Sequence, residues 1–130
     1  MNKIKIGPQY SKDREFKKKA RYHQSDFRAN TLKLKDYSEY GNRLSEKDAK
    51  NGFNFYDGYD IFKLVKQSEN FSKKLYSDML RSEHIPWNLF IPFREEKDIF
   101  KKVFSNLLDL DIVELINIDI EYAPSLKKPI

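Results

Sequence analysis

Three polar residues alternate with apolar ones near the end of the chain: Asn117, Asp119 and Glu121. In a strand, residues two positions apart point to the same face, so these three side chains would form one row. Carboxylate oxygens are ligands that Mg²⁺ prefers. Asp119 and Glu121 are therefore candidate metal ligands and candidate catalytic residues. The alternative is that the row is the solvent-facing side of an amphipathic strand.

A basic cluster lies near the N-terminus. The first 35 residues contain eleven Lys or Arg against three Asp or Glu, whereas the remaining residues contain fourteen against seventeen. Basic side chains on a helix could neutralise phosphates, which gives salt-sensitive and sequence-tolerant binding to DNA. The alternative is an ordinary solvated helix face. The candidate nucleic-acid contacts are Lys17, Lys18, Lys19, Arg21, Gln24 and Arg28.

The sequence lacks the residues or spacings that several other kinds of catalytic or metal-binding site require. The chain has no cysteine, which excludes disulfides, thiolate nucleophiles and Cys-type zinc sites. His23 and His84 are sixty-one residues apart in sequence, so they do not form a closely spaced metal-binding pair. Neither the glycine spacing nor the surroundings of any serine match a phosphate-binding loop or a nucleophile elbow.

Composition predicts one soluble folded domain. The 130 residues are 39% hydrophobic and 35% charged, but the aromatic share of 15% argues against general disorder. No apolar run approaches the roughly 20 residues that span a bilayer. We therefore expect a cytoplasmic protein with no membrane contact.

The hydrophobic pattern predicts mainly helices. We expect a helix over residues 13–31 with one apolar stripe, which consists of Phe16, Ala20, His23, Phe27 and Ala29. Further helices are expected at 59–67 and 71–81, and Ser45 is expected to cap a short helix that Gly52 ends. Residues 85–93, with two prolines, are expected to form a buried extended connection.

The C-terminal third shows two clear periodicities. Residues 95–109 have the pattern of an amphipathic helix, and residues 112–122 alternate as a strand does. One strand is not stable alone, so this one would need a partner.

Several short stretches, in order, resemble a family of bacterial restriction endonucleases with the PD-(D/E)XK nuclease fold. They are 21–29 (RYHQSDFRA), 40–44 (YGNRL), 48–49 (DA), 52–56 (GFNFY), 79–82 (MLRS), 88–92 (NLFIP) and 121–124 (EYAP). The resemblance covers about residues 20–124.

This resemblance implies an α+β fold: a mainly helical body, then the first helix and strand of a PD-(D/E)XK-like core. The expected organisation is a flexible basic arm over 1–10, a helical N-terminal region over 11–93 and the start of the nuclease-like αβ core over 94–130, in one globular unit. The family's metal-binding Asp and its Glu-x-Lys strand would lie beyond Pro124, so the sheet is expected to be incomplete within this chain. Among family catalytic residues only Glu121 is carried over.

The leading hypothesis is a restriction-endonuclease-like protein that contacts DNA and is not catalytic alone. It would represent a truncated nuclease, half of a split protein or a shortened relative kept for binding, with no cofactor of its own and Mg²⁺ only if the missing strands complete it. The alternative is a non-enzymatic interaction module that pairs residues 112–122 with a partner chain or in a homodimer. A third hypothesis is an active nuclease that uses Asp119, Glu121 and a borrowed lysine.

Overall fold

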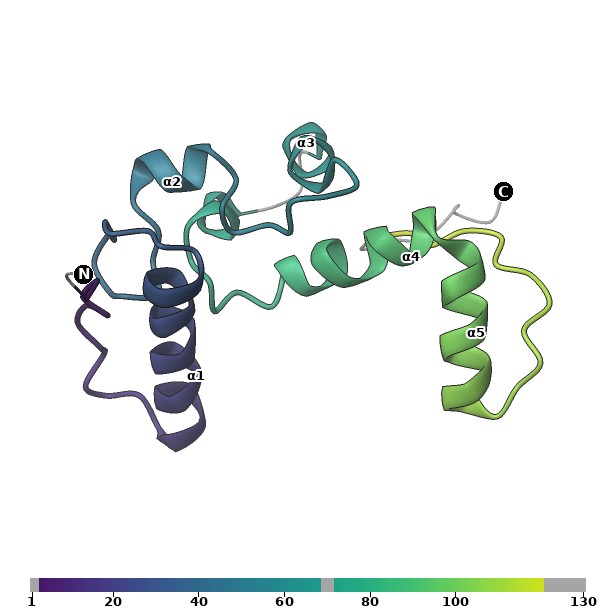
Figure 1. Ribbon diagram of the computed structural model, residues 1–130, viewed down its shortest axis with the longest axis horizontal. Helices are drawn as coiled ribbons and strands as arrows, with labels where there is room; N and C mark the ends of the chain where they lie inside the picture. The colour runs from purple at the N-terminus through teal and green to yellow at the C-terminus, as the bar shows by residue number, and fades with distance from the viewer. Residues whose placement is uncertain (1–2, 69–71, 121–130) are drawn as a thin grey trace, which may run out of the picture. The chain divides into compact units, whose positions relative to one another are not determined.

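The computed structural model describes residues 3–68 and 72–120, and the chain divides into two compact units, Met1–His84 and Ile85–Ile130. We call them unit 1 and unit 2 and describe each by itself (Figure 1). The division falls at residues 84 and 85, whereas the sequence analysis placed a boundary at 93 inside one globular unit.

In its described residues, unit 1 contains three α-helices joined by long irregular connections. They are α1 (Glu15–Asp26), α2 (Glu46–Lys50) and α3 (Ile61–Gln67). A π-helical turn, η1 (Phe27–Thr31), continues α1, so the helix expected over 13–31 is confirmed. The Ser45 cap is also confirmed, because its hydroxyl accepts a hydrogen bond from the Asp48 amide at 3.2 Å.

The helix expected over 71–81 is wrong beyond its first turn. Within the described residues this stretch forms only a 3₁₀ turn, η2 (Lys73–Tyr76). The chain then leaves the helical path because its backbone bonds to another segment. The Leu44 amide donates to the Ser77 carbonyl at 2.9 Å, and the Met79 amide donates to the Asn42 carbonyl at 3.2 Å.

The apolar core of unit 1 includes Phe55, Ile61, Val65 and Leu75, which are all buried. Leu44, Ala49 and Met79 are buried together, and partly buried apolar residues pack around them. α1 contributes none of these three residues, and the aromatic members of the apolar stripe expected on it are exposed. Phe16 is 86% exposed and Phe27 38% exposed.

α1 and η1 instead bury a polar side. Arg21, Ser25 and Arg28 are buried there, and Arg28 is fully buried. The Arg28 guanidinium donates from all three nitrogens to backbone carbonyls. Its acceptors are the carbonyls of Gly41 at 2.7 Å, Lys5 at 2.7 Å, Ile6 at 3.1 Å, Asp36 at 3.4 Å and Leu34.

These hydrogen bonds hold three separate stretches of chain around one charge. Burial lowers the pKa of Arg28, and the nearby ring of Tyr37, 5.0 Å away, acts in the opposite direction. Arginine nevertheless keeps its charge in proteins, so the buried cation needs every one of its acceptors.

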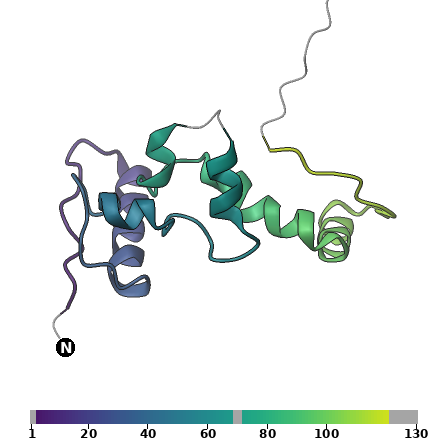
Figure 2. The same cartoon turned by 90° about the horizontal axis from the view of Figure 1, so that it is seen from above.

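The stretch expected to be a flexible arm runs beside α1 (Figure 1 and Figure 2). Besides the two carbonyls that Arg28 binds, the Pro8 carbonyl accepts from the Gly41 amide at 2.9 Å, and Gln9 Nε2 donates to the Ser25 hydroxyl at 3.1 Å. Gly41 is required at this crossing because an added Cβ would lie 2.0 Å from the Ile6 carbonyl oxygen.

Unit 2 is helical where an extended connection was expected. Residues 85–93 form η3 (Pro86–Phe90) and the start of α4 (Ile91–Glu95), so the extended assignment is wrong. Each proline lies in the first positions of its helical turn, where a missing amide hydrogen costs little. Trp87 and Ile91 are buried.

The helix expected over 95–109 is confirmed as α5 (Lys97–Leu108), which ends at Asp109 in the left-handed conformation. Phe93 of α4 meets Phe100 and Phe104 of α5 edge to face, with ring centroids 5.7 and 5.5 Å apart. The other apolar positions of α5 have no such cover, and the helix contains no buried residue.

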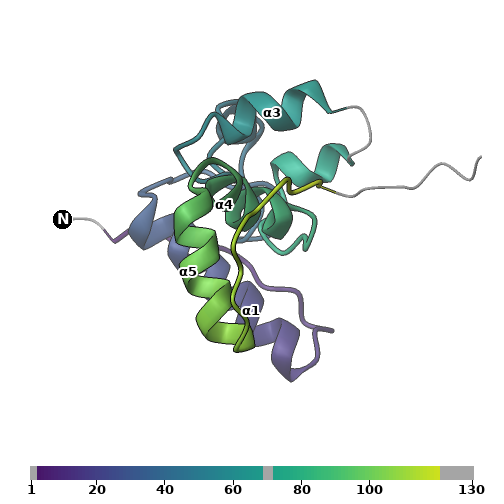
Figure 3. The same cartoon turned by 90° about the vertical axis from the view of Figure 1, so that its right-hand side faces the viewer.

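The strand expected over 112–122 is wrong as far as the structure describes it, and with it the α+β fold class. Residues 110–119 are extended but join no ladder, and the described parts of the chain contain only two isolated bridges, Tyr37–Leu44 and Arg43–Asp78. The extended segment runs back along α5 (Figure 1 and Figure 3), where Lys97 Nζ donates to the Ile116 carbonyl at 3.3 Å. Alternation creates a strand only where a neighbouring edge supplies hydrogen bonds. The described fold is therefore all-helical.

Within residues 3–68 and 72–120, no helix has the length and apolar character needed to cross a bilayer.

Replacing Arg28 should test the role of the buried guanidinium. Arg28→Met keeps an apolar stem but removes every donor, so several carbonyls lose their partner. We expect the free energy of unfolding to fall by about 3 kcal/mol or more. Urea denaturation followed by circular dichroism measures this change. Lys18→Met, on the exposed side of the same helix, is the control and should change stability by less than about 0.5 kcal/mol. Equal urea midpoints for the two variants would contradict the assignment.

Candidate nucleic-acid interface

α1 presents three consecutive lysines. Lys17, Lys18 and Lys19 are all exposed, and the Lys17 ammonium makes one long ion pair, 3.9 Å from the Asp13 carboxylate. Successive residues of a helix point about 100° apart, so the three cations fan out over the exposed surface. Gln24 is half-buried on the same helix.

Arg21 follows Lys17 by one helical turn and is 5% exposed. Its Nε donates to the Asp13 carboxylate and its Nη1 donates to Asn42 Oδ1 at 2.6 Å. The hydrogen bond with Asp13 is the main cause that raises the pKa of Arg21 and lowers the pKa of Asp13. The rings of Tyr10 and Tyr40 lie 5.9 and 5.0 Å from the guanidinium carbon.

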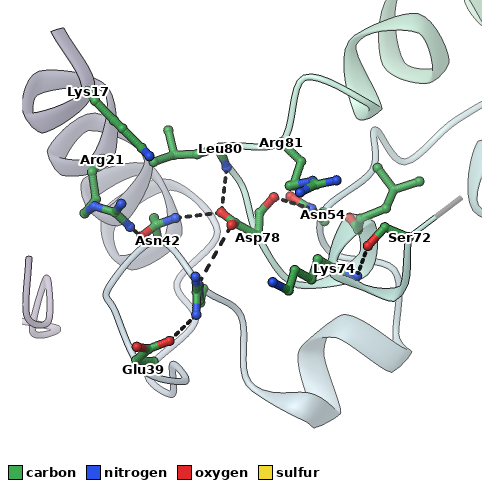
Figure 4. Close-up of polar contacts among 12 residues, drawn as sticks. Lys17, Arg21, Glu39, Asn42, Asn54, Ser72, Lys74, Asp78, Leu80 and Arg81 are labelled. Atoms are coloured by element: carbon green, nitrogen blue, oxygen red, sulfur yellow. Dashed lines mark hydrogen bonds and ion pairs between the residues drawn. The ribbon is translucent and has the colours of Figure 1, made fainter. Parts of the chain in front are cut away.

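Arg21 begins a polar network that crosses unit 1 (Figure 4). Asn42 accepts from Arg21 and donates from Nδ2 to Asp78 Oδ1 at 2.9 Å. The same Asp78 oxygen accepts from the Leu80 amide at 3.1 Å. Asn42 is fully buried, so its amide links α1 to the chain around residue 78 without access to water.

Arg43 extends this network toward the surface. It hydrogen-bonds to Glu39 and makes a longer ion pair with Asp78, with Nε to Oδ2 at 3.8 Å. Its guanidinium carbon lies 5.3 Å from the Tyr40 ring. The network therefore ties the loop carrying Tyr40 to the chain that follows η2.

Six residues were expected to contact nucleic acid, and the structure divides them into two groups. The three lysines and Gln24 lie on accessible or half-buried positions. Arg21 and Arg28 are buried, and their donors bind groups of the chain itself. In this structure the two arginines therefore position α1, and the accessible positive charge comes from the lysines.

The sequence analysis missed an exposed aromatic stripe on α1 and η1. Phe16, His23 and Phe27 are all exposed. Their spacings of seven and four residues place them within about 20° of one line along the helix. The spacing predicts an apolar stripe, and periodicity identifies a face without showing whether anything covers it.

The described residues do not fit a Mg²⁺ centre. Asp119 is exposed, and its Oδ1 accepts a hydrogen bond from Asn117 at 2.6 Å. No group of three or more His, Cys, Asp or Glu side chains gathers anywhere in the described ranges. The second expected ligand, Glu121, lies outside the described residues. The described part of the chain therefore supplies no ligand set for this ion.

Glu-x-Lys spacing does occur in the chain, at Glu15–Lys17 and at Glu95–Lys97, which the sequence analysis missed. The first pair opens α1 and the second joins α4 to α5. In a helix, side chains two positions apart point to different sides, whereas in a strand they share a face. The helical position of Glu15 and Lys17 therefore keeps them from converging on one ion.

Acid should weaken unit 1 through Asp13. A carboxylate whose pKa is lowered by folding contributes stability above its unfolded pKa, and that contribution is lost as the pH falls through the folded value. Asp13→Asn should therefore lower the urea midpoint at pH 7 and reduce its further decline towards pH 3. The control Glu46→Gln removes an exposed ion pair to Lys50 and should change the midpoint at pH 7 little. If both variants match the unmodified chain at pH 7, the Asp13–Arg21 pair does not stabilise the unit.

Comparison with known families gives one match. A family model described as the PD-(D/E)XK nuclease superfamily matches residues 11–130. Neither the curated proteins nor the solved structures give a match. The match includes α1, the polar network around Asp78 and all of unit 2, and it agrees with the resemblance seen in the short sequence stretches. This chain belongs to the PD-(D/E)XK nuclease superfamily.

Proposed function

We propose that this chain is a DNA-binding member of its superfamily and that α1 supplies its phosphate contacts. The observation that carries the proposal is the arrangement of charge on α1. Lys17, Lys18 and Lys19 are exposed, whereas Arg21 and Arg28 are buried and fix the helix. Membership of a nuclease superfamily makes DNA the expected partner.

Because α1 is held in place, its lysines are better suited to binding phosphates than to increasing solubility alone. Lysines on a mobile segment would lose conformational freedom when they met a phosphate backbone, and that loss would oppose binding. Here the helix backbone is already held through Arg21 and Arg28. Phosphate contacts alone carry no sequence information, so we expect binding that tolerates any sequence. The proposal concerns binding and includes no cleavage step.

Salt titration of duplex binding tests this proposal. The affinity of the full chain for a labelled duplex should fall steeply with salt concentration. The double variant Lys18→Ala, Lys19→Ala should weaken binding and reduce the logarithmic salt slope by about 0.9 for each phosphate that the variant no longer neutralises. Fluorescence anisotropy over a range of salt concentrations gives both values.

The matched control is Lys63→Ala, Lys73→Ala, which removes the same charge from exposed positions elsewhere in unit 1. It should leave the salt slope nearly unchanged. If both double variants weaken binding equally, only net charge matters and the α1 interface is wrong. If the unmodified chain does not bind duplex at low salt, the proposed function itself is wrong.

A second candidate function is self-association through unit 2. α5 leaves Ile99, Val103 and Leu107 exposed, and the following extended segment exposes Val113 and Ile116 at 80% and 83%. Monomeric proteins seldom expose contiguous apolar patches of this kind.

The charges of unit 2 favour a second copy of this chain as the partner that covers these apolar residues. Residues 109–120 contain Asp109, Asp111, Glu114 and Asp119 and no basic residue. α5 carries Lys97, Lys101 and Lys102 against one acid, Asp98. A two-fold interface could therefore place the acidic segment of one copy against the basic helix of the other.

Light scattering during size-exclusion chromatography tests self-association. The full chain should elute as a dimer, and Val113→Glu with Ile116→Glu should give a monomer because both side chains lose apolar cover and gain repulsion. Phe16→Glu, an equally exposed apolar position in unit 1, is the control and should remain dimeric. A monomeric unmodified chain at high protein concentration would exclude this candidate.

A further inference from the structure

We propose that the exposed stripe of Phe16, His23 and Phe27 stacks on unpaired bases, so that the α1 surface prefers single-stranded DNA to duplex. This inference rests on the proposed function and names its substrate class. It starts from Phe16, which is 86% exposed although it sits on a helix fixed by a buried network.

The helix geometry makes the stripe continuous. With about 1.5 Å of rise for each residue, Phe16 and Phe27 lie about 16 Å apart along the axis, and His23 lies between them. Unit 1 leaves these three residues exposed. Three flat ring systems in a row form a platform for several successive bases.

The charges beside the stripe identify the occupant as a nucleic acid. Lys19 lies about 60° to one side of the Phe16 line, and Lys17 lies about 100° to the other side. Both ammonium groups are exposed. A protein partner covering the aromatic rings would have to desolvate these cations, whereas a nucleic-acid strand supplies phosphates next to its bases.

The rings select unpaired bases. In a duplex the flat faces of the bases are stacked on one another, and a protein on the outside meets only their edges. An exposed phenyl ring stacks on a base face, which is accessible in single strands, bulges and frayed ends. Phosphate contacts contribute to both forms of DNA, so the stripe adds affinity for the single strand alone.

The experiment compares two probes of equal strand length, a labelled oligothymidylate and a labelled hairpin duplex, with the full chain at low salt. Phe16→Ala should weaken binding of the oligothymidylate by about fivefold or more. It should change hairpin binding by less than about twofold. Phe16→Leu, which keeps apolar volume without a flat ring, should lose nearly as much single-strand affinity as Phe16→Ala.

Phe53→Ala is the matched control, because Phe53 is 42% exposed in unit 1 and lies away from α1 in sequence. It should leave both affinities unchanged. Circular dichroism should show that Phe16→Ala folds normally, as its exposure predicts.

The outcomes separate this inference from the proposed function. If Lys18→Ala, Lys19→Ala weakens duplex binding but Phe16→Ala weakens neither probe, the proposed function stands and base stacking is wrong. If Phe16→Ala weakens both probes equally, the ring does not select unpaired bases and the inference is also wrong. If Phe16→Ala instead lowers the molecular mass measured by light scattering, the stripe binds protein and base stacking is wrong. If neither probe binds the unmodified chain, both proposals are wrong.

Discussion

A buried guanidinium cannot shed its charge at any ordinary pH, so a fold that encloses one must surround it with acceptors. Arg28 imposes this condition on unit 1. Its carbonyl partners come from the N-terminal stretch, from the segment after η1 and from Gly41. Arg21 does the same with Asp13 and Asn42. These charged hydrogen bonds therefore add directional cohesion to that of the buried apolar residues of the unit.

This constraint explains why α1 sits with its aromatic side outward. Both arginines and Ser25 occupy one side of the helix, and that side must face their acceptors. Phe16 is then left in solvent, together with the lysines. The basic residues of α1 and η1 have two different roles. Arg21 and Arg28 bind groups in the interior of the unit, whereas the lysines provide its accessible positive charge.

Local signals predicted local structure well. The Ser45 cap, α3 and α5 follow from capping residues and helical periodicity, and their bounds agree with the expected ones within a few residues. The segments whose structure differs from the expectation depend on contacts with residues distant in sequence. Residues 77–79 leave the helical path to bond around Asn42, and residues 110–119 lack the neighbouring edge that a strand needs. The candidate interface was predictable in its lysines, whereas the burial of Arg21 and Arg28 depends on residues distant in sequence.

The Asn42–Asp78 hydrogen bond spans 36 positions, and it connects the Arg21 network to the end of unit 1. During synthesis, the N-terminal half of this unit leaves the ribosome before Asp78 exists. Its helices can form early, but the amide of Asn42 and the buried side of α1 stay without their final partner until that carboxylate emerges. The last link of the Arg21 network therefore closes only after translation has passed Asp78 and that residue has left the ribosome.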